Sequence, residues 1–376
     1  KSNGTCNRPA GSVKVISPAN DEKNSEKSPR NTSNTNISDG NMKTWKEYFI
    51  EMHMKEYFEQ LKPEDYQPEK LKELSDLCSP YMTVLKMDEM KSSEDRTSRI
   101  PLNSVLAGFH NLKEIDLCFK QTYLSDNFSW GALNTSNQDI SLLAKGLDKL
   151  RLQILRITNS DINCEKVILI LKSLLKHPLR ILDLSHCKIG NKGVLAIARF
   201  ALEVPVEEMF LINNRFSYKG ATGLAYIFTQ LSCKISKLDI KLNSILNEGG
   251  DILFKSLTTQ GRSLKYLSVA ACGITKTDFL SKMVAVNETL EELDICNNNM
   301  SEEGGRRILE AVQHNRTIKK FDLRMTGIDF KLELQIQELI AENRKNSRRD
   351  VKSLKKIGDA FTVDSVVIYE LANILQ

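Results

Sequence analysis

Residues 179–189, LRILDLSHCKI, place Leu182 and Leu184 at alternate positions and Cys187 three residues later. Such alternation is typical of a short strand with one buried face, because successive side chains of a strand point to opposite faces. The same spacing, L-x-x-L-x-L-x-x-(N/C)-x-L, recurs in ISKLDIKLNSI (235–245) and LEELDICNNNM (290–300). The chain therefore repeats one strand-and-turn unit.

Seven copies of this pattern follow a degenerate opener at Leu112, Ile115 and Leu117, and they start at Leu152, Leu179, Val206, Ile235, Leu264, Leu290 and Ile318. Successive starts differ by 27, 27, 29, 29, 26 and 28 residues, which leaves room for a helix behind each strand. We therefore predict an α/β fold, a leucine-rich-repeat solenoid of about eight units. These long repeats resemble the ribonuclease-inhibitor-like class, which implies a horseshoe with parallel strands inside and α-helices outside.

The position after each strand carries a small polar group, namely Ser160, Cys187, Asn214, Asn243, Cys272, Asn298 and Thr326. The chain turns sharply there, and an unpaired buried backbone group would cost about 1–3 kcal/mol. We expect these side chains to bond the turn of one repeat to the next. The eight cysteines form no CxxC pair, so we expect them to be reduced thiols rather than disulfides or metal ligands.

Composition and motifs offer no sign of an enzyme. The 376 residues carry 53 basic and 48 acidic side chains, a balance too even to indicate nucleic acid or a membrane surface as the partner. The sequence has no phosphate-binding loop, no signal-peptide pattern at its start and no apolar run of the roughly 20 residues that a spanning helix needs. Its histidines are dispersed. We expect no cofactor, no metal, no small-molecule substrate and no catalytic residue.

Four regions follow from these patterns. Residues 1–42 are polar and expected to be disordered, and residues 43–96 are expected to form an N-terminal helical cap or docking region. Residues 97–328 hold the repeats, with an insertion at 119–137, and residues 329–376 form a closing helix and tail. Phe128 and Trp130 in the insertion are either anchors for a partner or side chains that fold back onto the repeats.

Residues that alternate with the framework leucines line the concave strand face, where we expect a polypeptide to bind. They carry mixed charge, with two aromatic residues near the middle and an acidic column that runs along the face. The candidate partner-binding residues are Asp116, Arg156, Asp183, Phe210, Asp239, Lys241, Tyr266, Asp294, Asp322 and Arg324. The alternative is that the face is only solvated, and that the aspartate before the leucine at the end of each strand is simply common in this class of repeat.

Several segments resemble the T-complex-associated testis-expressed protein 1 family, the leucine-rich-repeat subunit 5 of the dynein regulatory complex. They include segments outside the repeats and span about 43 to 345: MKTWKEYFIEMHMKEYFEQL (42–61), AGFHNLKEIDL (107–117), FSW (128–130), SLLKHPLRILDLSHCKIGNKG (173–193), LDIKLNSILNEGG (238–250), FDLRMTGID (321–329) and AENR (341–344). The resemblance carries over Trp45, Phe49, Phe128 and Trp130 as matched features. The polar start and the tail after residue 350 depart from the family.

This resemblance implies a non-catalytic part of the nexin link of motile cilia and flagella, which regulates dynein-driven motility. The implied partners are other subunits of the dynein regulatory complex and the axonemal doublet microtubule assembly. The implied location is the cytoplasm, the cytoskeleton and the axoneme of the cilium or flagellum. Two alternatives use the same repeat fold: a Ran-GAP-like GTPase activator, and a ubiquitin-ligase adaptor with residues 43–96 as an F-box-like helix set.

Overall fold

The computed structural model describes residues 69, 79–80, 82–88, 90, 100–119, 135–259 and 263–360, with side chains for all of these except 259 and 348–360. The chain divides into two compact units, residues 1–44 and 45–376, and the described elements all belong to the second. The segments 1–42 and 361–376, as well as Phe128 and Trp130 of the insertion, lie outside the described residues.

The described part contains one sheet of nine strands, in which every strand pairs in parallel with the next along the chain. The strands are β1 (Val84–Met87), β2 (Glu114–Cys118), β3 (Ile154–Thr158), β4 (Ile181–Asp183), β5 (Glu208–Phe210), β6 (Lys237–Asp239), β7 (Tyr266–Ser268), β8 (Glu292–Asp294) and β9 (Lys320–Asp322). Strands and helices alternate, which confirms the predicted α/β leucine-rich-repeat solenoid.

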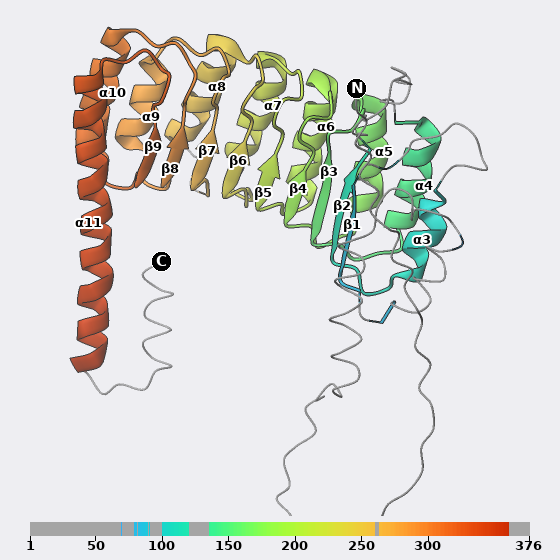
Figure 1. Ribbon diagram of the computed structural model, residues 1–376. Coiled ribbons are helices and arrows are strands. Elements are labelled where there is room, and N and C mark those ends of the chain that lie inside the picture. Colours follow the sequence, from blue (N-terminus) through green and yellow to red (C-terminus); the bar gives the residue numbers. More distant parts are fainter. Residues whose placement is uncertain are drawn as a thin grey trace, which may run out of the picture. The chain divides into compact units, whose positions relative to one another are not determined.

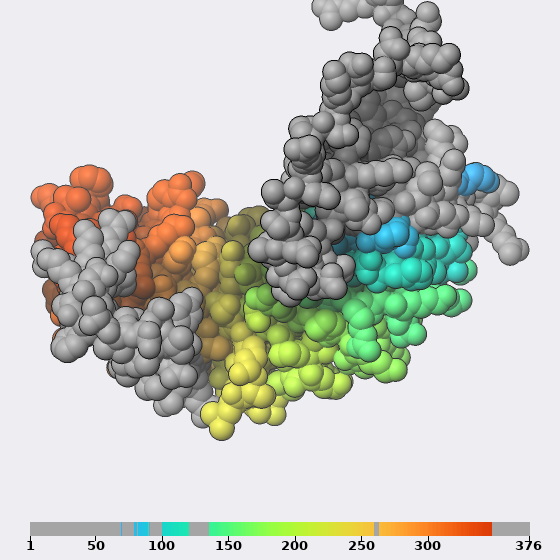
Figure 2. All heavy atoms as spheres, turned by 90° about the horizontal axis from the view of Figure 1, so that it is seen from below, coloured from blue at the N-terminus to red at the C-terminus, as the bar shows by residue number. Residues whose placement is uncertain are grey.

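The helices form a second layer on one side of this sheet (Figure 1). They are α3 (Leu102–Gly108), α4 (Asn137–Leu147), α5 (Cys164–Leu174), α6 (Gly190–Glu203), α7 (Tyr218–Phe228), α8 (Leu246–Thr259), α9 (Asp278–Val286), α10 (Glu302–His314) and α11 (Phe330–Ala360). The units follow one another in chain order (Figure 2), and each packs against its neighbours. Among the described helices, none is both long and apolar enough to cross a membrane.

The sheet has one strand more than the sequence patterns predicted, because β1 lies within the segment 43–96 that was assigned to a helical cap. β1 pairs with β2 in the register Leu85 to Ile115 and Met87 to Leu117, and Leu85 and Met87 are fully buried. The pattern is hard to detect there because three of its framework positions hold methionine, namely Met82, Met87 and Met90, all of them buried. No asparagine or cysteine turn follows it in the sequence.

The core lies between the strands and the helices and is built from the framework residues of the repeat. Leu155, Leu182, Met209, Leu238 and Leu267 occupy the same register position on successive repeats, and each is fully buried. Burial of one such side chain contributes roughly 1.5–3 kcal/mol. A single unit cannot cover these side chains by itself, so each repeat depends on the repeats beside it.

The predicted polar turns form a buried ladder of asparagine side chains. The Asn243 side-chain oxygen accepts the Asn214 backbone N–H at 2.7 Å, and its Nδ2 donates to the Leu211 carbonyl of the previous repeat at 2.9 Å. Asn214 bonds the repeat before it in the same way, through the Cys187 N–H at 3.0 Å and the Leu184 carbonyl at 2.8 Å. Both asparagine side chains are fully buried. The ladder therefore satisfies backbone groups that would otherwise remain unpaired.

Cysteine occupies two positions of this ladder and acts as a weak donor. The Cys187 thiol donates to the Ile157 carbonyl at 3.0 Å, and the Cys272 thiol donates to the Ile240 carbonyl at 3.4 Å. Asn298 accepts the Cys272 N–H at 3.0 Å. The six cysteines in the described residues are all free thiols.

A second asparagine ladder, which the sequence analysis did not predict, joins the ends of the last helices to the strands that follow. The Asn287 oxygen accepts the Leu290 N–H at 2.8 Å, and its Nδ2 donates to the Leu257 carbonyl at 3.0 Å. Asn315 repeats this arrangement with the Ile318 N–H at 2.8 Å and donates to the Asn287 carbonyl at 3.0 Å. The sequence signal is an asparagine three residues before the first framework residue.

Helix α11 closes the carboxyl-terminal end of the stack. Ile336 and Ile340 are fully buried, and the Gln337 amide donates to the Phe321 carbonyl on the last strand at 2.7 Å. Asn343 donates to the carbonyl of Ile318 at 3.1 Å. The helix thus covers the apolar flank and pairs backbone groups that no further repeat would satisfy.

We expect Asn243→Ala to lower the free energy of unfolding by about 2 kcal/mol or more, because it leaves buried backbone groups unpaired. Denaturant unfolding followed by circular dichroism measures the change. The control is Gln313→Ala on the exposed side of α10, which truncates an amide in water and should stay within about 0.5 kcal/mol of the parent. Equal stability of the two variants would contradict the ladder's role.

Burial raises the pKa of the Cys187 and Cys272 thiols to about 12. At pH 8 these thiols are therefore almost entirely protonated, and the thiolate is the reactive form. We expect a thiol-alkylating reagent to modify the half-buried Cys164 much faster than either ladder cysteine, as site-resolved mass spectrometry can show. Denaturation should remove the difference; equally rapid labelling in the native protein would refute it.

Candidate interaction surface on the strand face

The sheet side that is not covered by helices carries the residues that alternate with the buried framework, and we call it the strand face. Strand pairing aligns one of its rows across all nine strands. The row consists of Lys86, Asp116, Arg156, Asp183, Phe210, Asp239, Ser268, Asp294 and Asp322. The five predicted aspartates therefore do share one row, but other residues interrupt it.

Four of these aspartates hold the turn that follows their own strand. In each case one carboxylate oxygen accepts the backbone N–H two residues later: Asp183 from Ser185 at 2.9 Å, Asp239 from Lys241 at 3.2 Å, Asp294 from Cys296 at 3.0 Å and Asp322 from Arg324 at 3.1 Å. Aspartate is well suited to such local bonds. The acidic row therefore has a structural role in addition to any role in binding.

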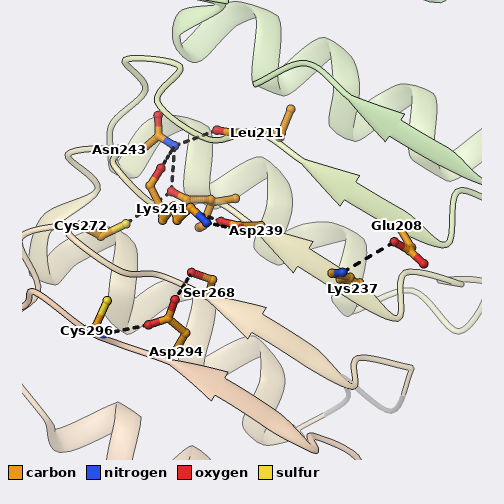
Figure 3. Close-up of polar contacts among 11 residues, drawn as sticks. Glu208, Leu211, Lys237, Asp239, Lys241, Asn243, Ser268, Cys272, Asp294 and Cys296 are labelled. Carbon is orange, nitrogen blue, oxygen red and sulfur yellow. Dashed lines mark hydrogen bonds and ion pairs between the residues drawn. The ribbon is translucent and has the colours of Figure 1, made fainter. Parts of the chain in front are cut away.

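Toward the carboxyl-terminal end, the second carboxylate oxygen is occupied as well. Lys241 Nζ lies 3.1 Å from Asp239, and the Ser268 hydroxyl donates to Asp294 at 2.8 Å (Figure 3). Asp239 is only 4% exposed, and this burial raises the pKa of its carboxyl group. The Arg324 guanidinium binds Asp322 at 2.6 Å and lowers the pKa of that carboxyl group.

The centre of the strand face holds a cation between two aromatic rings. Lys237 Nζ lies 5.0 Å from the Phe210 ring centroid and 5.1 Å from that of Tyr266, distances typical of cation–π contacts. Glu208 is the nearby anion, 4.0 Å from Lys237 Nζ (Figure 3). Burial raises the pKa of the Tyr266 hydroxyl to about 12, so this group stays neutral. We call Phe210, Lys237 and Tyr266 the aromatic centre.

Sequence reasoning placed Phe210 and Tyr266 in this surface but did not include Lys237 among the binding residues. Pairing of Glu208 with Lys237, and of Lys237 with Tyr266, brings the lysine between the two rings. An alignment of the repeats would have given this strand register and would have placed Lys237 beside the two rings.

The amino-terminal end of the face contains fewer cations. Arg156 is paired with Glu114, and Lys86 lies 3.4 Å from Asp88. Asp116 is half-buried, and this burial raises the pKa of its carboxyl group. No ion pair joins Asp116 or Asp183 to a cation within the described residues.

Asp294, Cys296 and Asp322 bring their ligand atoms within 4.8 Å of one another, yet their chemistry does not favour a metal. Burial raises the pKa of the Cys296 thiol to about 11, and one Asp294 oxygen already accepts the Cys296 N–H at 3.0 Å. The carboxylate of Asp322 already binds Arg324 through three hydrogen bonds. Hydrogen bonding within the turns accounts for this cluster.

We expect Arg324→Gln to raise the pKa of Asp322, because it removes the cation that stabilises the carboxylate. A lowered pKa stabilises the fold above the unfolded-state value, and this contribution disappears as the pH falls through the folded-state value. Carboxyl carbon NMR titration of the parent and the variant measures the change. Arg306→Gln, on α10 beside Glu302, should leave Asp322 unaffected, whereas an unchanged Asp322 in Arg324→Gln would disprove the assignment.

The comparisons with known proteins agree with the repeat architecture. A family model described as Leucine Rich repeat matches residues 176–198 and 286–309, which contain β4 and β8 with the helix starts that follow them. No curated protein matches the chain in sequence.

Three solved structures are similar at low identity. Actin-binding site 2 of leiomodin-1 is 14% identical with a TM-score of 0.28, and the match covers 60% of this chain and 99% of that one. The mouse RP105/MD-1 complex is 13% identical with a TM-score of 0.36, and the match covers 65% of this chain and 35% of that one. The TLR13–ssRNA13 complex is 16% identical with a TM-score of 0.41, and the match covers 68% of this chain and 34% of that one. The chain spans about a third of the length of the last two. The nine parallel strands of the described part, the helices that alternate with them and the matched repeats show that this chain is a leucine-rich-repeat protein.

Proposed function

We propose that this chain is a non-catalytic scaffold whose strand face binds a segment of another protein. The aromatic centre is the observation that carries the proposal. Phe210 and Tyr266 offer apolar contact area on either side of Lys237, and aromatic residues near the middle of a surface contribute much of the binding energy in protein interfaces. Mixed charges surround this centre, as in a polar rim.

The rigidity of the sheet supports the same proposal. Phe210, Asp239 and Ser268 stand on backbones that the asparagine ladder holds in register. Side chains fixed in this way lose little conformational entropy when a partner binds. The face therefore suits recognition of a polypeptide better than turnover of a small molecule.

For the biological setting, we propose the dynein regulatory complex of motile cilia and flagella. The support is the resemblance of segments outside the repeats, chiefly 42–61 and 128–130, to the subunit 5 family. In this proposal the chain is a structural subunit of the nexin link in the axoneme, and it binds other subunits of the complex on the doublet microtubule assembly. Acceleration of GTP hydrolysis or binding of a Skp1-type partner would instead favour the alternatives.

The test uses the immobilised full chain and proteins extracted with salt from motile axonemes. We expect subunits of the dynein regulatory complex to be retained, and the double variant Phe210→Ala with Tyr266→Ala to retain them about tenfold or more weakly. The matched control is Tyr226→Ala on α7, where the side chain is 56% exposed. Full retention by the double variant would exclude the strand face, and retention of none of these subunits would exclude the ciliary setting.

A further inference from the structure

The helical layer carries exposed apolar side chains on two neighbouring helices, α5 and α6, which lie side by side (Figure 1). Their repeats start 27 residues apart, and the strands before them pair in the same 27-residue register. Ile168 is therefore equivalent to Leu195, and Leu175, at the C-cap of α5, is equivalent to Leu202. All four side chains are 37–46% exposed. Adjacent exposed apolar side chains mark an interaction site more often than scattered ones do.

The repeat framework does not require apolar residues at these two positions. The framework residues of α5 and α6 point into the core, and they include the fully buried Ile170 and Ile197. In the helices of four other repeats the two outer positions are polar, namely Ser141 and Asp148 in α4, Thr222 and Thr229 in α7, Asp251 and Thr258 in α8, and Arg306 and Gln313 in α10. The apolar pairs on α5 and α6 thus need an explanation other than folding.

Two cations stand between these apolar side chains, Lys172 on α5 and Arg199 at the equivalent position on α6. Lys172 follows Ile168 by four residues and precedes Leu175 by three, so it lies on the same side of its helix. Both cations are exposed, and neither has an ion pair among the residues that the structure describes. The exposed carboxylates of α5 and α6 stand near the helix ends.

We call the four apolar residues and the two cations the outer patch, and its dimensions suit a helix. Residues seven apart on a helix lie about 10 Å apart along its axis and on nearly the same side. Packed helix axes are also about 8–10 Å apart. The four apolar side chains therefore stand at the corners of a square of about 10 Å. A helix with its side chains is about 10–12 Å wide, so a single helix laid across the patch can contact all four.

We propose that the outer patch binds an amphipathic α-helix of another protein, which carries apolar residues seven positions apart and a carboxylate between them. Its apolar residues contact the corners of the patch, and its carboxylate pairs with Lys172 and Arg199 at the centre. A second copy of this chain would place the same cations against each other, and a lipid bilayer would bury them among acyl chains. The patch is separate from the strand face, so the proposal is independent of the proposed function.

The test selects binders on the full chain from a displayed library in which one face of a monomeric helix is randomised. We expect the selected helices to share apolar residues seven positions apart, with glutamate or aspartate between them. The double variant Leu175→Gln with Leu202→Gln should bind them about tenfold or more weakly, because it removes apolar contact area at exposed positions. The matched control is Val286→Gln on α9, which also changes an exposed apolar side chain and should leave the affinity unchanged.

A charge reversal tests the centre of the patch. Lys172→Glu with Arg199→Glu should weaken the selected helices by about tenfold, since like charges then face each other. Lysine in place of the acidic residue of the selected helix should restore binding to this variant. Equal affinity of the acidic helix for the parent and the reversed chain would contradict the charge pairing and overturn the proposal.

The remaining outcomes distinguish this surface from the strand face and from other occupants. Phe210→Ala with Tyr266→Ala should leave the selected helices bound. Helices that lose affinity in that variant, or that tolerate the double glutamine variant, would overturn the proposal, as would failure to select any helix. Binding to vesicles of phosphatidylcholine and phosphatidylserine that the glutamine variant abolishes would assign the patch to a membrane instead. Self-association in analytical ultracentrifugation that the same variant abolishes would assign it to a second copy.

Discussion

Hydrogen bonding of the backbone in the turn after each strand is the constraint on which this structure depends. The turn is buried, so its N–H and C=O groups have no access to water and must bond within the protein. Asn243 meets this requirement by joining the turn at Asn214 to its own repeat. Several turns are completed by a side chain of the next repeat, which is an asparagine, a cysteine that acts as a weak donor, or Ser160, whose hydroxyl accepts the Phe119 N–H. The stability of one unit therefore depends on the position of the next, and the ladder fixes the register of the whole sheet.

That register determines what the strand face can present. The same pairing that aligns the ladder aligns Phe210 with Asp239 and brings Lys237 beside Tyr266. The row of aspartates also stabilises the turns beside the strand face, because four of these carboxylates accept a backbone N–H of the following turn. An acidic row on a repeat protein is therefore weak support for a binding site when considered alone. Stronger support comes from side chains that the turns do not use.

Sequence patterns predicted the strands from the opener at Leu112 onward and the role of Asn214, Asn243 and Cys187 in the turns, because period and polar position are both local signals. The second ladder was missed, since a single asparagine before a framework leucine resembles an ordinary turn residue. β1 was not predicted because no asparagine or cysteine stands at the turn position after it. The position of Lys237 between two rings depends on contacts between repeats about 29 residues apart, which no local pattern encodes. The candidate anchors Phe128 and Trp130 stay predictions, because they lie outside the described residues.

The ion pairs of the strand face contribute more to selectivity than to stability. Pairs such as Lys320 with Glu292 are exposed on both sides, and exposed pairs contribute about 0–1 kcal/mol. A partner that approaches the face must compete with these pairs or bring charges that fit beside them, so they discriminate between partners and orient the bound segment. The Phe210 and Tyr266 rings of the aromatic centre impose a smaller desolvation cost, because they are largely apolar. Affinity is therefore expected to come from the middle of the face, and selectivity from the ion pairs around it.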